Sequence, residues 1–123
     1  MIKARRIAVL DIGKTNAKLV IVDGETGAEV AEKRTRNRTL PGQPYPHYDI
    51  EGLWRFACDA LTGFAREPGY DAISITTHGA SAVLIDAEGR PALPVLDYEH
   101  LYPENIRAAY DAIRPSFTET FSP

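Results

Sequence analysis

Residues 6–23 read RIAVLDIGKTNAKLVIVD and decide the fold, because they place two apolar runs on either side of one short polar turn. Residues 6–12 and 17–23 are rich in Val, Ile and Leu, which favour extended structure. The four residues between the runs, GKTN at 13–16, predict a hairpin turn. The stretch therefore indicates two antiparallel strands that are joined at a polar tip.

The segments that follow predict a third strand and then a helix. A second turn, DGETG at 23–27, leads into AEVAEKRTR at 28–36, whose alternation is typical of an exposed or edge strand. The proline-rich loop at 37–49 crosses to a helix for which Asp49 is the expected N-cap. Apolar residues then recur at three- and four-residue spacing, which predicts one buried helix face: Ile50, Leu53, Trp54, Ala57, Leu61, Phe64 and Ala65.

The remainder predicts two more strands and a second helix. A strand runs up to the polar interruption THGAS at 77–81, a further strand is expected at 81–86, and DAEG at 86–89 forms a tight turn. Residues 102–115 form a helix that Pro115 ends. The order β-β-β-α-β-β-α predicts a mixed α/β domain, with Trp54 and Cys58 in or beside the core.

Composition excludes several classes of protein. With 123 residues, 44% apolar and 25% charged, the chain suits one globular domain with a modest core. Its net charge of −3 gives no positive field for nucleic acid or an anionic membrane. The single cysteine, Cys58, excludes an internal disulfide and fits a reducing cytoplasm. The apolar run at 7–10 is too short for a signal peptide or a membrane span.

The letters GKT at 13–15 raise the possibility of a nucleotide-binding P-loop. That motif needs a glycine five residues before the Gly of GK[ST], whereas position 8 is Ala8. The P-loop lysine also opens a helix, whereas GKTN is followed by the β-type run AKLVIVD. The sequence therefore argues against a P-loop.

A hairpin turn that binds a polyphosphate fits the same residues better. Glycine at the tip lets the backbone approach phosphate oxygens closely, and the adjacent lysines add positive charge. Asp11 cannot bind phosphate itself, but it can hold a hydrated Mg²⁺, which accepts one or two protein carboxylates. A strand-end Asp that only caps a turn is the structural alternative. The expected phosphate-binding residues are Gly13, Lys14, Thr15, Asn16 and Lys18.

These motifs resemble a known family of kinases. DIGKTNAK followed by VIVD resembles the first phosphate motif of the sugar kinase, hexokinase and actin superfamily, whose nucleotide-binding domains have a ribonuclease H-like fold. The later HYDIEGLWRFACDAL, AISITTHGASAVLIDAEGRPALPVL and DYE are similar to the N-terminal domain of FGGY-type carbohydrate kinases. The resemblance spans residues 6–115. It departs from the family pattern at Lys14, where most members have Thr, and at LDYEH (96–100), where Trp-x-Asp-x-Arg is common.

The resemblance implies that residues 1–123 are the N-terminal part of the sugar-binding domain of a two-domain kinase. It implies transfer of the γ-phosphoryl group of MgATP to a hydroxyl of a small sugar. The catalytic carboxylate base, the adenosine pocket and the second phosphate motif are then expected beyond Pro123, so residues 1–123 alone are expected to be inactive. The implied sugar-binding residues are Thr77, His78, Gly79, Tyr98 and Glu99, with Asp97 as a weaker candidate.

Two other functions stay open at this point. A nucleotide- or sugar-sensing module could keep the hairpin but lack phosphoryl transfer, and the departures at Lys14 and LDYEH keep this alternative open. An actin-like assembly protein is the third possibility, although no residue specifically indicates filament formation. The sequence names neither the sugar nor the oligomeric state, so ketopentoses, ketohexoses, deoxy sugars and a homodimer all stay open.

Overall fold

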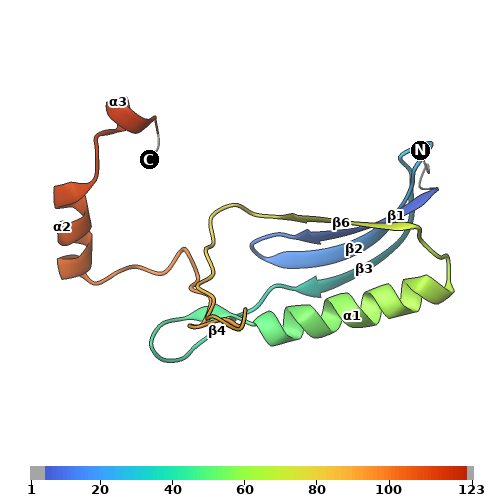
Figure 1. Cartoon of the computed structure of the whole chain (residues 1–123), viewed down its shortest axis with the longest axis horizontal. Helices are drawn as coiled ribbons and strands as arrows, with labels where there is room; N and C mark the ends of the chain where they lie inside the picture. Colours follow the sequence, from blue (N-terminus) through green and yellow to red (C-terminus); the bar gives the residue numbers. More distant parts are fainter. Residues whose placement is uncertain (1–4, 122–123) are drawn as a thin grey trace.

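A four-stranded mixed sheet with one helix packed on it forms the body of the protein in the computed structural model, which describes residues 5–121 (Figure 1). The strands lie in the order β3-β2-β1-β6. Their bounds are β1 Arg6–Ile12, β2 Asn16–Asp23, β3 Glu29–Arg36 and β6 Ala72–Thr77. Helix α1, Ile50–Arg66, covers one face of the sheet. The predicted mixed α/β class is confirmed.

The first three strands form the antiparallel meander that the sequence predicts. β1 pairs with β2 so that Asp11 lies opposite Lys18, and β2 pairs with β3. The turn after β2 is closed by the Asp23 carboxylate, which accepts hydrogen bonds from the backbone N–H groups of Glu25 and Thr26. Local turn chemistry and alternating apolar residues therefore explain these three strands of the sheet.

The fourth strand makes the sheet mixed. β6 lies parallel to β1, with Asp11 opposite Thr76. Two parallel strands need a long connection, and here it includes the short strands β4 (Thr39–Leu40) and β5 (His47–Tyr48), which pair with each other, followed by α1. The carboxyl ends of β1 and β6 consequently meet at one edge, where His78 N donates to the Ile12 carbonyl at 3.0 Å.

The core lies between α1 and the sheet. Alternate residues of β1 and β2 point toward the helix, and they pack with three residues of α1; the cluster is Ala8, Leu10, Leu19, Ile21, Ala57, Ala60 and Phe64. As predicted, Asp49 caps α1, because its carboxylate accepts from Gly52 N at 2.8 Å.

The prediction that Trp54 belongs to the core is wrong, because its side chain is 68% exposed. At about 100° of rotation per residue, Trp54 lies roughly a quarter-turn around the helix axis from the stripe of Ala57, Ala60 and Phe64. Cys58, which adjoins Ala57 in the chain, is half-buried.

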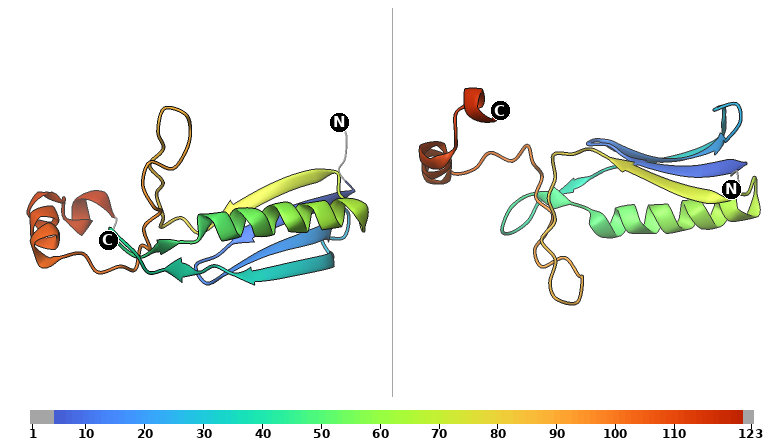
Figure 2. Two further views of the ribbon diagram at one scale, coloured as in Figure 1. Left: turned by 90° about the horizontal axis from the view of Figure 1, so that it is seen from below. Right: turned by 45° about the horizontal axis from the view of Figure 1, so that its top comes forward.

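The strand predicted at 81–86 is also wrong. Among the described residues this segment makes only one isolated bridge, between Ile85 and Pro91, and it forms a loop closed by the turn at 86–89. Its apolar residues Val83, Leu84 and Ile85 are each more than half exposed, because no neighbouring strand pairs with them. Figure 2 shows the gold loop around residue 85 projecting away from the sheet and α1.

Two helices follow this loop. α2, Glu104–Ile113, confirms the helix predicted within 102–115, and the four-residue α3 spans Phe117–Thr120. Both lie apart from the sheet (Figure 1). Within residues 5–121, no helix has the length and apolar character that are needed to cross a bilayer.

Candidate functional site

Three segments that are far apart in the sequence meet near the carboxyl ends of β1 and β6. They are the hairpin turn at 13–16, the segment 77–79 that starts with the last residue of β6, and the loop at 96–100, which we call the acceptor loop because its carboxylates accept hydrogen bonds from Lys14. The turn reaches the acceptor loop through Lys14, and His78 reaches it through the ring of Tyr98. Almost all the residues that the sequence singled out lie in or beside these three segments.

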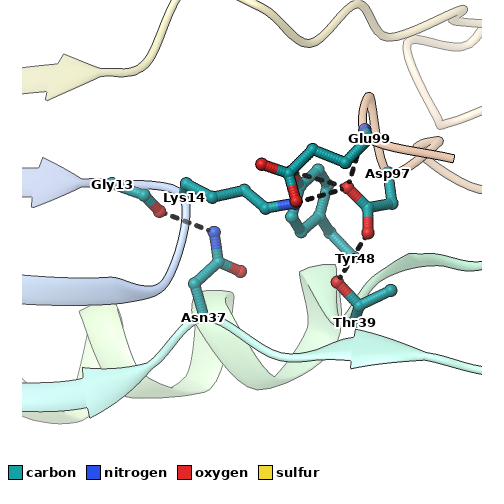
Figure 3. A network of polar contacts seen from close by, with 7 residues as sticks. All are labelled: Gly13, Lys14, Asn37, Thr39, Tyr48, Asp97 and Glu99. Atoms are coloured by element: carbon teal, nitrogen blue, oxygen red, sulfur yellow. Dashed lines mark hydrogen bonds and ion pairs between the residues drawn. The ribbon is translucent and has the colours of Figure 1, made fainter.

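The hairpin turn is braced from inside. Gly13 N donates to the Asn16 carbonyl at 2.8 Å, which closes the turn. Asn37 is only 8% exposed, and its Nδ2 donates to the Gly13 carbonyl at 2.8 Å while its backbone N donates to the Thr15 carbonyl (Figure 3). These bonds fix the backbone and leave the side chains of Thr15 and Asn16 exposed to solvent.

Asp11 opens onto a small pocket beside this turn. The pocket has a volume of about 250 Å³ and is lined by Asp11, Gly13, Thr15, Asn16, Lys18 and Arg34. It therefore gathers four of the five expected phosphate-binding residues around the expected metal ligand. A larger groove of about 640 Å³ adjoins it at Thr15 and Asn16 and adds the cations of Lys14, Arg36 and Arg38.

The donors at this pocket suit a hydrated magnesium ion better than a transition metal. Among residues 5–121, no three His, Cys, Asp or Glu side chains gather closely enough to hold a metal by themselves. Magnesium needs only one or two carboxylates, because it keeps several waters and takes phosphate oxygens as further ligands. The single carboxylate of Asp11, half-buried and surrounded by basic side chains, fits that requirement.

Lys14 points away from this pocket and toward the acceptor loop (Figure 3). Its Nζ lies 2.7 Å from Asp97 Oδ1 and 2.8 Å from Glu99 Oε2. The same ammonium lies 4.8 Å from the centroid of the Tyr98 ring and 5.8 Å from that of Tyr48, within cation–π range. The hydrogen bonds that Lys14 donates to Asp97 and then to Glu99 raise its pKa well above the ordinary value, so the side chain stays charged.

Asp97 is the centre of a hydrogen-bond network. Besides Lys14, its carboxylate accepts from Thr39 Oγ1 at 3.2 Å, from Glu99 N at 3.1 Å and from the Tyr48 hydroxyl at 3.4 Å. The hydrogen bond from Lys14 is the main reason that the pKa of Asp97 is lowered. Both carboxylate oxygens of Asp97 are therefore occupied by hydrogen bonds that hold the acceptor loop in place.

Tyr48 supports both the network and the ring cluster. Its side chain is 4% exposed, and burial raises the pKa of its hydroxyl. Its backbone N donates to the Val95 carbonyl at 2.9 Å, which ties β5 to the start of the acceptor loop. His78 lies against both tyrosines, with ring centroids 5.7 Å from Tyr48 and 5.4 Å from Tyr98.

The His78 ring carries an unused polar atom. Its Nδ1 is buried and has no hydrogen-bond partner among the described residues. Thr77 and Gly79, which flank it, are exposed. Of the five residues expected at the sugar, the structure therefore brings together His78, Tyr98 and Glu99, and it leaves Thr77 and Gly79 at the surface beside them.

Sequence reasoning missed three residues of the site, namely Asn37, Thr39 and Tyr48. All three come from the connection between β3 and α1, whose strands β4 and β5 have only two residues each, so no periodicity separates a functional side chain from an ordinary loop residue. Their roles depend on contacts with residues 24 to 58 positions away in the chain. Only the position of Tyr48 directly before the N-cap Asp49 could have suggested burial.

Comparison with known proteins gives related sequences and folds, although no family model matches the chain. It is 31% identical over 99 residues to the L-fuculokinase of Salmonella typhi, an alignment that covers 76% of this chain and 21% of that protein. A carbohydrate kinase from Novosphingobium aromaticivorans is 33% identical, with a TM-score of 0.83 over 94% of this chain and 25% of that one. The chain thus spans about a quarter or less of these relatives.

A more distant structure shares the fold alone. The glycerol kinase of Plasmodium falciparum, solved with ADP, is 14% identical and aligns with a TM-score of 0.69 over 89% of this chain and 23% of that one. The mixed sheet with α1 is thus an arrangement found in part of several small-molecule kinases.

Proposed function

Because the chain belongs to the FGGY carbohydrate kinase family over the part that it spans, we propose that the full-length protein is an ATP-dependent kinase of a small sugar. It would transfer the γ-phosphoryl group to a sugar hydroxyl. The observation that carries the proposal is the meeting of the braced hairpin turn with His78 and the acceptor loop. Such chemistry depends on positioning and charge neutralisation more than on covalent participation of the protein.

The phosphate end of the site lies in the pocket at Asp11. We assign contacts with phosphate oxygens to Gly13, Thr15, Asn16 and Lys18, and the fixed backbone of the turn supports this assignment. Asp11 would hold Mg²⁺ through water. A bound Mg²⁺ supplies neutralisation of the phosphate charge. Lys14, which the sequence placed in the same set, is held by Asp97 and Glu99 in this structure.

The sugar end lies between His78 and the acceptor loop, with Thr77 and Gly79 at its margin. The imidazole of His78 can form a hydrogen bond with a sugar hydroxyl without carrying a charge, although its Nδ1 is buried in this structure and would reach the sugar only after the ring rotates. The Tyr98 ring can stack on the apolar face of a sugar, while the exposed carboxylate of Glu99 can accept a hydroxyl proton in a hydrogen bond. These residues would orient the acceptor rather than activate it.

The residues described here leave the catalytic base unassigned. Asp97 already accepts four hydrogen bonds, Glu99 is paired with Lys14, and Asp11 faces the phosphate end. We therefore propose that a carboxylate outside residues 1–123 deprotonates the sugar hydroxyl. Closure of a second domain over the site would exclude water and prevent hydrolysis of ATP.

The test is an assay of ADP release by the full-length protein with MgATP and a panel of ketopentoses, ketohexoses and deoxy sugars. We expect release that depends on one class of sugar. Binding of ATP and sugar with no sugar-dependent release of ADP would instead favour a sensing module. The isolated chain is the second sample, and turnover at about 1 per second or more would contradict the assignment of the base to another part of the protein.

A further inference from the structure

Lys14 belongs to the phosphate-binding turn by sequence but to the acceptor loop by contact. Its Nζ is engaged at 2.7 Å by Asp97 and at 2.8 Å by Glu99. The residues that line the pocket at Asp11 include both neighbours of Lys14 in the chain, Gly13 and Thr15, but not Lys14 itself. The backbone of the turn therefore lines the pocket at Asp11, whereas the side chain of Lys14 contacts the acceptor loop.

The surroundings of Lys14 favour this arrangement over a contact with phosphate. Two carboxylates face one ammonium, and the rings of Tyr98 and Tyr48 lie within cation–π range. An ammonium has three N–H donors, and two of them already point at carboxylate oxygens. One donor is left for a phosphate group, and a full transfer of Lys14 to phosphate would leave Asp97 and Glu99 facing each other without a cation.

The two carboxylates depend on Lys14 to different degrees. Asp97 has other anchors, because its carboxylate also accepts from Thr39 and Tyr48 and its backbone N donates to the Pro46 carbonyl. Glu99 has one cationic partner in the described structure, Lys14, and its side chain is 62% exposed. Without Lys14, mutual repulsion would displace Glu99 first, and the adjoining Tyr98 would move with it.

We propose that Lys14 is a positioning residue for the sugar rather than a ligand of the nucleotide. It holds Glu99 in place and keeps Tyr98 against His78, so that the acceptor loop presents an ordered surface to the sugar. This inference rests on the proposed kinase function, because it assigns the acceptor loop to the sugar. It also gives Lys14 a role different from that of Lys18, which lines the pocket at Asp11.

The test compares the full-length protein with Lys14→Met, Lys14→Arg and Lys18→Met. We expect Lys14→Met to raise the KM for the sugar by about 10- to 100-fold, as a small misplacement of a positioning group does. The KM for ATP should stay within about threefold of the wild-type value, because the substitution weakens sugar binding and leaves the contacts of the nucleotide unchanged. Lys14→Arg should recover most of the sugar affinity, since a guanidinium can bridge two carboxylates. Lys18→Met should instead raise the KM for ATP and leave the KM for the sugar nearly unchanged.

Hydrogen exchange supplies a readout that needs no turnover. Amides at 97–100 should exchange faster in Lys14→Met than in the wild type, while amides of α1 should keep their rates and report an intact fold. Unchanged exchange in the acceptor loop would overturn the inference, and so would a rise in the KM for ATP without one for the sugar. The proposed kinase function has its own test, because it is wrong if the wild type shows no sugar-dependent release of ADP. In that case the hydrogen-exchange data still decide whether Lys14 holds the acceptor loop in place.

Discussion

The two glycines inside α1 give a sharp test of how the helix is built. Replacing Gly by Ala inside a helix ordinarily stabilises it by about 1 kcal/mol. At Gly63 a new Cβ would lie 2.6 Å from Lys33 Nζ, the flexible end of a side chain that can rotate away. That rotation gives up the contact of Lys33 with the Phe64 ring at 5.2 Å, which is worth about 0.5 kcal/mol at an exposed site. We expect Gly63→Ala to stabilise α1 by about 0.5 kcal/mol.

Gly52 predicts a different result, because its Cβ would collide with the helix cap. The added carbon would lie 2.7 Å from Asp49 Cγ, so the carboxylate would have to leave its place. The hydrogen bond from Gly52 N to Asp49 Oδ1, 2.8 Å long, would then be lost. Loss of an N-cap costs about 1 kcal/mol, which offsets the gain from alanine. We expect Gly52→Ala to leave the stability of α1 nearly unchanged.

A double-mutant cycle with Asp49→Ala separates these terms. Once the cap is gone, Gly52→Ala has no carboxylate to displace and should stabilise α1 by about 1 kcal/mol. The free energy of local opening, measured by hydrogen exchange of α1 amides in the full-length protein, is the quantity to compare. Equal effects of Gly52→Ala with and without Asp49 would refute the reasoning. Gly63→Ala serves as the matched control, because its effect should not depend on Asp49.

Three further predictions follow from the site and the core. Asp11→Asn should lower kcat by about 100-fold or more, because it weakens the proposed Mg²⁺ site, and unchanged kcat in an ADP-release assay would contradict that role. Phe64→Ala should destabilise the fold by about 3 to 5 kcal/mol, whereas Trp54→Ala should change stability by less than about 0.5 kcal/mol; denaturant titration that gives equal losses would disprove this. The pKa of Asp97 is lowered in the folded protein, so its ion pair with Lys14 stabilises the acceptor loop at any pH above the usual aspartate pKa of about 3.9. This stabilisation is lost as the pH falls through the lower pKa of the folded state. A carboxyl titration by NMR with a midpoint at or above that usual value would argue against the ion pair.

The parts of the fold that the sequence predicts are those with local causes. The hairpin follows from two apolar runs and a polar turn, and the start of α1 follows from Asp49 and the apolar spacing after it. The strand expected at 81–86 shows the limit of this reasoning. An apolar run favours extended structure, but a strand also needs a continuous partner, and the described chain gives this segment only the isolated bridge between Ile85 and Pro91.

The site shows the same division between local and long-range causes. The pocket at Asp11 was predictable, because its residues come mainly from one hairpin whose register the sequence determines. The network around Asp97 was not, since Lys14 and Asp97 are 83 positions apart and Tyr48 comes from the irregular connection. The resemblance to FGGY kinases implied a sugar-binding role for Tyr98 and Glu99, but it gave no reason to pair them with Lys14.

The two departures from the family pattern meet in space. By the resemblance to FGGY kinases, Lys14 takes the place of the usual Thr, and Asp97 and Glu99 belong to the segment LDYEH, which takes the place of Trp-x-Asp-x-Arg. A lysine at this half-buried turn, beside Tyr48, would be costly without a counter-charge. Two close carboxylates in the acceptor loop would be costly without a cation. Because each change supplies the charge that the other needs, the departures form one compensated unit, and neither by itself weakens the proposal of a kinase site.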